Sequence, residues 1–131
     1  MKKKSPTWYR KKRKQRSKHA ILLDKAVETF NRWIRERDKV RLGGKCYTCF
    51  GEGSEAGHFR HNNNATKFSE VFVNLQCTKC NRWLSGNLGA YAIRLYKDHP
   101  KELIDKLWKE SFTNKTFTIG ELEAIIKKYS L

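Results

Sequence analysis

Four cysteines have the spacing that most directly indicates chemistry in this sequence. They form two C-x-x-C pairs, one at Cys46 and Cys49 and one at Cys77 and Cys80, separated by 27 residues. Each pair can present two thiolates to one tetrahedral zinc ion, and four thiolates leave no open coordination position. A redox site would need a single C-x-x-C motif in a βαβ setting, which the sequence lacks. We therefore predict a structural zinc site that connects the two ends of the intervening loop.

The loop between the pairs holds side chains that are used in phosphodiester chemistry: His58, Arg60, His61 and Asn74, with Asn81 directly after the last cysteine. Because residues 45–76 are rich in Gly, Asn and Ser, they depend on zinc for their shape, and zinc can contribute about 10 kcal/mol or more to folding. Phosphodiester hydrolysis needs a base that activates water and a divalent cation that stabilises charge. Since the zinc fixes the helix start after Cys80, we expect His58 and Asn81 to face one another across a phosphate.

Each of these residues has a simpler interpretation when it is taken singly. A lone histidine is usually an ordinary polar residue, and an asparagine beside a C-x-x-C pair often caps a turn or a helix. The nuclease interpretation depends on their order and spacing, which run C-x-x-C, G-H and then N-L-Q-C-x-x-C-N.

Across residues 45–96 the sequence resembles the phage NinG/Rap recombination proteins. The motifs that carry the resemblance are Cys46-x-x-Cys49, Ala56-Gly57-His58-Phe59-Arg60, Gln76-Cys77-x-x-Cys80-Asn81 and Leu84-Ser85-Gly86-Asn87, together with Phe68 and Tyr91. That family is associated with structure-selective cutting of branched DNA, including Holliday junctions and displacement loops. The four cysteines followed by an Asn are also similar to phage endonuclease VII, a junction resolvase. The resemblance implies a ββα-metal (HNH-type) endonuclease core.

The resemblance also implies roles for individual residues. His58 would be the general base, Asn81 would bind a catalytic Mg²⁺ or Mn²⁺, and Asn74 would take the middle, loop-orienting position. A homodimer is expected from the reaction, since cutting two strands of a junction requires two active sites. Phage recombination proteins are further candidate partners.

Two positions depart from the family pattern. In most HNH enzymes an Asp or His directly precedes the base and helps to bind the catalytic metal, whereas this chain has Gly57 there. The groups that could replace it are Glu55, Glu70 and His61, of which we take Glu55 as the candidate second metal ligand. The middle Asn of the motif commonly lies where this chain has Phe72.

The charge of the chain favours a polyanionic partner. Lys and Arg number 29 against 13 Asp and Glu, a formal net charge of +16, and residues 1–23 contain no carboxylate. We interpret residues 1–19 as a flexible basic arm. The candidate nucleic-acid contacts are Lys11, Lys12, Arg13, Arg35, Arg60 and Arg82. No stretch approaches the roughly 20 apolar residues that span a bilayer, so we expect a cytoplasmic protein, in the host cytoplasm if a phage encodes it, without a membrane partner.

The apolar pattern of residues 20–131 predicts one small α+β domain with flanking helices around the core at 45–96. A helix over 20–42 is indicated by Leu23, Val27, Phe30 and Ile34, and a strand by the alternation of Val71, Val73 and Leu75. Helical stripes follow over 88–96 and 103–108, and Thr118 and Glu121 form a capping-box pair before a last helix. We expect the carboxyl-terminal helices to serve packing rather than chemistry.

Three functions compete at this point: a structure-selective DNA endonuclease, a non-catalytic zinc module that binds branched DNA or RNA, and a zinc adaptor for other proteins. The charge disfavours the adaptor. The histidine between the C-x-x-C pairs favours the endonuclease, while Gly57 keeps the binding module in consideration. A sequence-specific HNH nuclease is disfavoured because shape recognition through phosphates suits basic arms and helices better.

Overall fold

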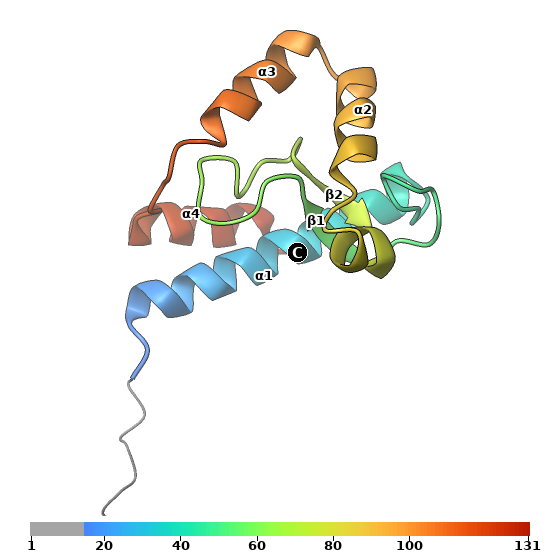
Figure 1. The fold of residues 1–131 in the computed structure, drawn as a ribbon. Coiled ribbons are helices and arrows are strands. Elements are labelled where there is room, and N and C mark those ends of the chain that lie inside the picture. Colours follow the sequence, from blue (N-terminus) through green and yellow to red (C-terminus); the bar gives the residue numbers. More distant parts are fainter. Residues whose placement is uncertain (1–14) are drawn as a thin grey trace, which may run out of the picture.

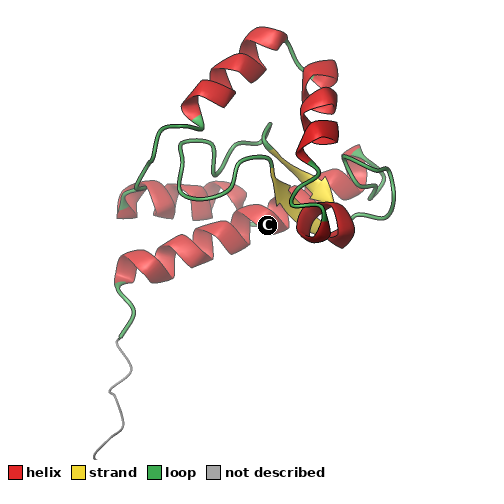
Figure 2. Ribbon diagram, in the orientation of Figure 1, coloured by secondary structure: helices red, strands yellow, loops and turns green. Residues whose placement is uncertain are grey.

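The computed structural model describes residues 15–131, in which four α-helices and one π-helical segment surround a two-stranded sheet (Figures 1 and 2). The elements in chain order are α1 (Lys18–Arg41), β1 (Glu55–His58), β2 (Val73–Gln76), η2 (Lys79–Trp83), α2 (Leu88–Asp98), α3 (Lys101–Glu110) and α4 (Ile119–Tyr129). The small α+β class predicted from the sequence is confirmed. None of the helices in this part of the chain combines the length and the apolarity needed to cross a bilayer.

Helix α1 begins two residues earlier than the sequence suggested. Ser17 is its N-cap, and the Ser17 hydroxyl accepts a hydrogen bond from the Ala20 amide at 3.1 Å. The ring of His19 lies 2.7 Å from the carbonyl oxygen of Phe117, which ties the first turn to the segment before α4. The helix therefore includes Lys18 and His19, which the sequence analysis assigned to the basic arm.

One apolar layer lies between α1, α4 and one face of the sheet. Phe30 and Ile34 of α1 are fully buried against Val73 of β2 and Tyr129 of α4. The rings of Phe30 and Tyr129 meet edge to face with centroids 4.8 Å apart. The helical stripe predicted for α1 is thus in contact with the core, and Figure 1 shows α1 and α4 side by side.

A second apolar layer covers the opposite side of the sheet. Its fully buried aromatic members include Tyr47, Phe72 and Tyr91, which pack with residues of α2 and α3. Tyr91 also donates a hydrogen bond to the Gly57 carbonyl at 2.7 Å, so α2 is fixed directly to β1. The sheet therefore lies between two layers, with α1 and α4 on one side and η2 and α2 on the other.

The strands are shorter than the apolar alternation suggested. Antiparallel pairing joins Glu55 with Gln76 and His58 with Val73, and Val71 lies in the turn before β2. Because side chains alternate across a strand, Glu55 and Gly57 point to the η2 face while Ala56 and His58 point to the α1 face. This alternation separates the residues that the sequence placed in one site.

Candidate functional site

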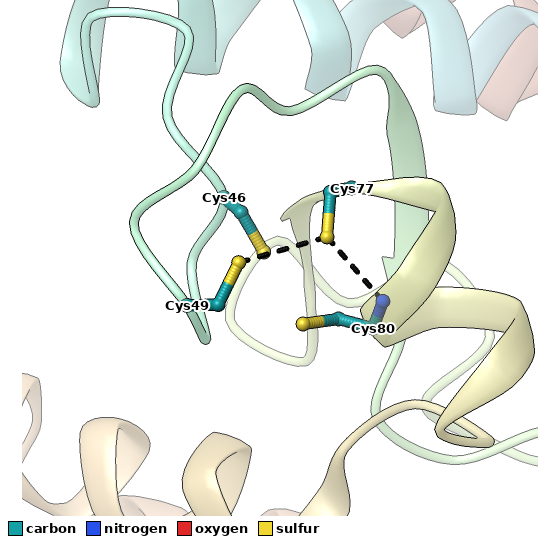
Figure 3. A group of neighbouring side chains, drawn as sticks. All are labelled: Cys46, Cys49, Cys77 and Cys80. Atoms are coloured by element: carbon teal, nitrogen blue, oxygen red, sulfur yellow. Dashed lines mark hydrogen bonds between the residues drawn. The ribbon is translucent and has the colours of Figure 1, made fainter.

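The four cysteines come together as predicted. Their sulfur atoms all lie within 4.8 Å of one another, and Cys49 Sγ is 3.6 Å from Cys77 Sγ (Figure 3). A zinc ion bound at about 2.3 Å by four thiolates needs sulfurs roughly 3.8 Å apart, close to this arrangement. Among residues 15–131 this is the one group of three or more potential Cys, His, Asp or Glu ligands. The cluster could hold a structural metal such as zinc.

Local backbone geometry prepares the cysteines for metal binding. The Cys46 amide donates to the Gly51 carbonyl at 2.6 Å, and the Cys80 amide donates to Cys77 Sγ at 3.3 Å. Burial acts to raise the pKa of Cys46, but hydrogen bonds from the Thr48 hydroxyl and from backbone amides outweigh it and lower that pKa to about 6. A thiolate is therefore favoured at Cys46 at neutral pH, as metal binding requires.

His58 ends β1 and turns towards α1. Its Nε2 lies 3.0 Å from Oδ1 of Asn31, and because an amide oxygen only accepts, Nε2 carries the proton and Nδ1 the lone pair. Burial lowers the pKa of His58 to about 4, with smaller contributions from the positive charges of Lys67 and His61. The ring is therefore neutral at pH 7 with Nδ1 unprotonated, and the same burial and positive charge make it a weaker base than a free histidine.

A pocket of about 240 Å³ opens beside His58. It is lined by Val27, Asn31, His58, Arg60, His61, Asn62 and Lys67. No carboxylate lines it, and Arg60 and Lys67 give it positive charge, so its chemistry suits an anion such as a phosphate. The sequence pointed to His58, Arg60 and His61 but missed Asn31 and Lys67. Asn31 looked like one of several polar residues on α1, and only the tertiary contact with β1 brings it to His58.

Asn81 and Glu55 form a separate polar pair on the η2 face. The Asn81 amide donates to Glu55 Oε1 at 2.8 Å, and the same oxygen accepts from Arg82 at 3.0 Å. Thr78 donates to the other carboxylate oxygen at 2.8 Å. The arrangement expected from the sequence, with His58 and Asn81 facing one another, differs from what is observed, because the two residues have different partners and neither Asn81 nor Glu55 lines the His58 pocket.

The structure gives a steric reason for Gly57. A Cβ atom at this position would lie 1.9 Å from Oε1 of Gln76, because the Gln76 carboxamide fills the space beside the Gly57 Cα. The Gln76 side-chain nitrogen donates to the Thr48 hydroxyl and to the Gly86 carbonyl, which holds the carboxamide in place. The carboxylate common in HNH enzymes therefore has no room at position 57 in this packing.

Asn74 lies in the core rather than at a surface. It is fully buried, donates to the Tyr91 hydroxyl at 3.0 Å and to the Val71 carbonyl at 2.9 Å, and accepts from Arg41 at 2.6 Å. The Val71 contact anchors the turn that precedes β2. Phe72, at the position where the middle Asn of the motif commonly lies, belongs to the apolar core.

The remaining candidates are dispersed. Arg35 is half-buried on α1, Arg82 is exposed beside Glu55, and Glu70 binds the Tyr129 hydroxyl beside α4. Lys11, Lys12 and Arg13 lie outside the described residues. Arg37 of α1 turns inward, with its Nε 2.8 Å from Oδ1 of the buried Asp38.

The fold and the cysteine cluster define a small α+β protein with a four-cysteine site. The chain matches the family model described as Bacteriophage Lambda NinG protein over residues 1–131, and it belongs to that family. It is 31% identical over 109 residues to Protein ninG of Escherichia phage lambda, an alignment that covers 82% of this chain and 53% of that protein. Protein ninG of Salmonella phage P22 is 29% identical over 109 residues, an alignment that covers 82% of this chain and 53% of that protein. The chain thus spans about half the length of these curated relatives. No solved structure matches.

Proposed function

We propose that this protein is a metal-dependent endonuclease that cuts branched recombination intermediates such as Holliday junctions and displacement loops, with His58 as the general base. The observation that carries the proposal is a neutral histidine, held by Asn31, in a positively charged pocket of phosphate-compatible size. The order of β1, β2 and the following helical segments, with the cysteines at the base of the hairpin, supports assignment to the ββα-metal class.

In the proposed reaction the pocket holds the scissile phosphate through Arg60, Lys67 and His61. Water attacks phosphorus while Nδ1 of His58 takes its proton, and the bond from phosphorus to the leaving sugar oxygen breaks. Asn31 keeps the proton of the resting ring on Nε2 and so directs the lone pair of Nδ1 to this task. The leaving oxygen takes a proton from solvent, and His58 releases its proton before the next turnover.

Two metals belong to the proposal. Zinc would be structural at Cys46, Cys49, Cys77 and Cys80. Glu55 and Asn81 would hold Mg²⁺ or Mn²⁺, and their donor chemistry fits, because Mg²⁺ is commonly bound by one or two carboxylates together with substrate phosphates and water. For Asn81 to serve, its amide has to turn so that Oδ1 replaces the donating NH₂ group. When bound, the ion would supply charge stabilisation for a phosphate. Because Glu55 and Asn81 lie on the opposite face of the hairpin from the His58 pocket, the ion could act on a phosphate in that pocket only if this segment rearranged.

A non-catalytic zinc module that binds branched DNA or RNA is the second candidate. The observation that favours it is the separation of His58 from the Glu55 and Asn81 pair on opposite faces of the hairpin, with Gln76 filling the space at Gly57. In either case the expected substrate is branched nucleic acid. For the endonuclease we add a homodimer, which provides one site per cut strand, in the cytoplasm of the phage host and in contact with phage recombination proteins.

The test is incubation of the purified protein, with and without Mg²⁺ or Mn²⁺, with matched linear, flap and four-way-junction DNA. His58→Ala should abolish metal-dependent cutting while zinc content and DNA binding stay close to those of the unaltered protein. His99→Ala serves as the matched control, because His99 follows α2 and is not among the residues that line the pocket. Cutting by His58→Ala at the normal rate would remove the base assignment, and binding without cutting under any metal would favour the second candidate.

A further inference from the structure

Arg60 lines the His58 pocket, and no carboxylate of the described chain pairs with its charge. Within residues 15–131 its guanidinium takes part in no hydrogen bond or ion pair, and its Nε is buried without a hydrogen-bond partner. A buried donor of this kind is costly unless water or a ligand satisfies it. The side chain therefore has unused hydrogen-bonding capacity at the pocket that the proposed reaction uses.

Two aromatic rings hold this guanidinium in place. The Arg60 Cζ lies 4.7 Å from the ring centroid of Trp108 and 4.7 Å from that of Phe112. The two rings meet edge to face with centroids 5.0 Å apart, so the three centres form a nearly equilateral triangle. Arg60 thus lies in the notch of an aromatic pair, where cation–π attraction limits its movement. Within residues 15–131 its N–H groups remain without a hydrogen-bond acceptor.

The aromatic pair comes from a part of the chain that the sequence assigned to packing alone. Trp108 belongs to α3, and Phe112 follows its end; their exposed fractions are 39% and 63%. On its other side Trp108 contacts the ring of Phe59 with centroids 5.9 Å apart, which connects the notch to the core layer behind β1. Both rings are thus partly exposed and share their contact with Arg60.

We propose that Trp108 and Phe112 are positioning residues, which hold the Arg60 guanidinium at the His58 pocket so that it binds a backbone phosphate of DNA. An arginine is suited to this role because its planar fork matches two phosphate oxygens at once, and holding it in advance reduces the entropy lost on binding. The inference rests on the proposed use of the pocket for a DNA phosphate, but it does not require cleavage.

The experiment measures the affinity of the full chain for a fluorescent four-way junction over a range of KCl concentrations, with zinc bound and Mg²⁺ omitted so that no cutting occurs. Arg60→Ala should weaken binding roughly tenfold at low salt and reduce the slope of log affinity against log salt by about 0.9, the value for one lost phosphate contact. Phe112→Leu and Trp108→Leu should each move the slope in the same direction, although both keep Arg60.

Double variants distinguish positioning from general packing. Adding Phe112→Leu to Arg60→Ala should cause no further loss of affinity, because the ring acts through the guanidinium. Trp108→Phe, which retains an aromatic face, should restore most of the binding lost in Trp108→Leu. Trp83→Leu is the matched control, since Trp83 is 81% exposed in η2 and makes no cation–π contact within the described chain.

Additive losses in the double variant, or an unchanged salt slope in both leucine variants, would overturn the inference. Phe112→Leu keeps the test decisive if Trp108→Leu fails to fold, because the Phe112 ring is largely exposed. A nuclease assay that shows no cutting while the binding results hold would reject the proposed catalysis and leave the positioning role standing. Normal cutting together with additive binding losses would support the proposed catalysis and reject the positioning role.

Discussion

Different interactions stabilise the two faces of the β1–β2 hairpin. On the α1 face, Phe30, Ile34 and Tyr129 exclude water from Ala56 and Val73, and burial of apolar surface dominates. On the opposite face the strands themselves present the polar side chains of Glu55, Asn74 and Gln76, which are held by hydrogen bonds. The aromatic layer that contains Tyr91 and the cysteine cluster complete this side. The difference shows that a sheet of only two short strands can be supported by apolar packing alone on one side and by apolar packing combined with hydrogen bonds and a candidate metal site on the other.

The difference also bears on where chemistry can occur. The His58 pocket lies at the edge of the apolar face, where burial and nearby positive charge keep the ring neutral. The Glu55 carboxylate lies on the polar face, and although burial opposes it, hydrogen bonds from Asn81, Thr78 and Arg82 lower its pKa. On one strand, the environment thus keeps His58 uncharged on one face and favours the charged form of Glu55 on the other.

The largest effect should come from removing the metal site. Cys80→Ser replaces a buried cysteine of the cluster, and because structural zinc contributes about 10 kcal/mol or more, the loss is comparable to the whole stability of a small domain. We expect fast amide exchange over residues 45–53 and 77–87, and metal analysis should find one zinc per chain before the change and none after it. Slow exchange in a metal-free variant would show that the η2 face does not depend on the metal.

On the apolar face, Phe30→Ala should lower the free energy of unfolding by about 3–5 kcal/mol, because it empties a fully buried position between two aromatic rings. Chemical denaturation measures this change, and zinc content should stay the same. Val40→Ala is the control on the same helix, since Val40 is 88% exposed and should change stability by no more than about 0.5 kcal/mol. A loss of zinc in Phe30→Ala would mean that the two faces are not independent.

Lowering the pH should reduce the free energy of unfolding, because protonation of His58 is disfavoured in the folded protein. The folded protein keeps His58 neutral down to about pH 4, whereas the unfolded chain protonates it near pH 6.5, so unfolding takes up a proton between these values. Stability is therefore lost as the pH falls from 6.5 to 4, by at most about 3 kcal/mol.

The measurement for His58 is the difference in unfolding free energy between the unaltered protein and His58→Gln at each pH. Taking this difference removes the acid sensitivity that the cysteine site contributes to both proteins. The difference should change across the window from pH 6.5 to pH 4 and stay level above it. A difference that is independent of pH would mean that His58 titrates normally in the folded protein.

The smallest expected effect concerns the polar face at Gly57. Gly57→Ala should cost about 1–3 kcal/mol, because the added methyl group would meet the Gln76 carboxamide at 1.9 Å. Combining it with Gln76→Ala removes the obstacle, so thermal unfolding of the double variant should show less loss than the sum of the single changes. Simple additivity would show that Gln76 moves aside without cost.

Local patterns in the sequence predicted the parts of the fold that local chemistry determines. The C-x-x-C spacing located the cysteine cluster, helical periodicity located α1 to α4, and the box formed by Thr118 and Glu121 is present at the start of α4. These features depend on residues that lie within a few positions of one another, or on ligands with a demanding coordination geometry. They could therefore be identified without knowledge of tertiary contacts.

The candidate site was predicted less completely because it depends on contacts between distant segments. His58 and Asn31 meet only when α1 packs across β1, and Arg60 meets Trp108 only when α3 returns to the hairpin. Strand alternation could have indicated that Glu55 and His58 point to opposite faces, but the bounds of such a short strand were not evident from the sequence. The burial of Asp38 among Arg37, Arg41 and the Leu75 amide likewise had no local signal.

The pairing of α1 with α4 has a consequence for synthesis on the ribosome. The partners that cover Phe30 and Trp33 include Tyr129, in the last helix of the described chain. At about 5–20 residues per second, the ribosome needs several seconds to translate from α1 to α4. During this time Phe30 and Trp33 are not yet packed against Tyr129. The cysteine loop and the hairpin emerge earlier, so metal capture can organise the middle of the nascent chain before the two outer helices meet.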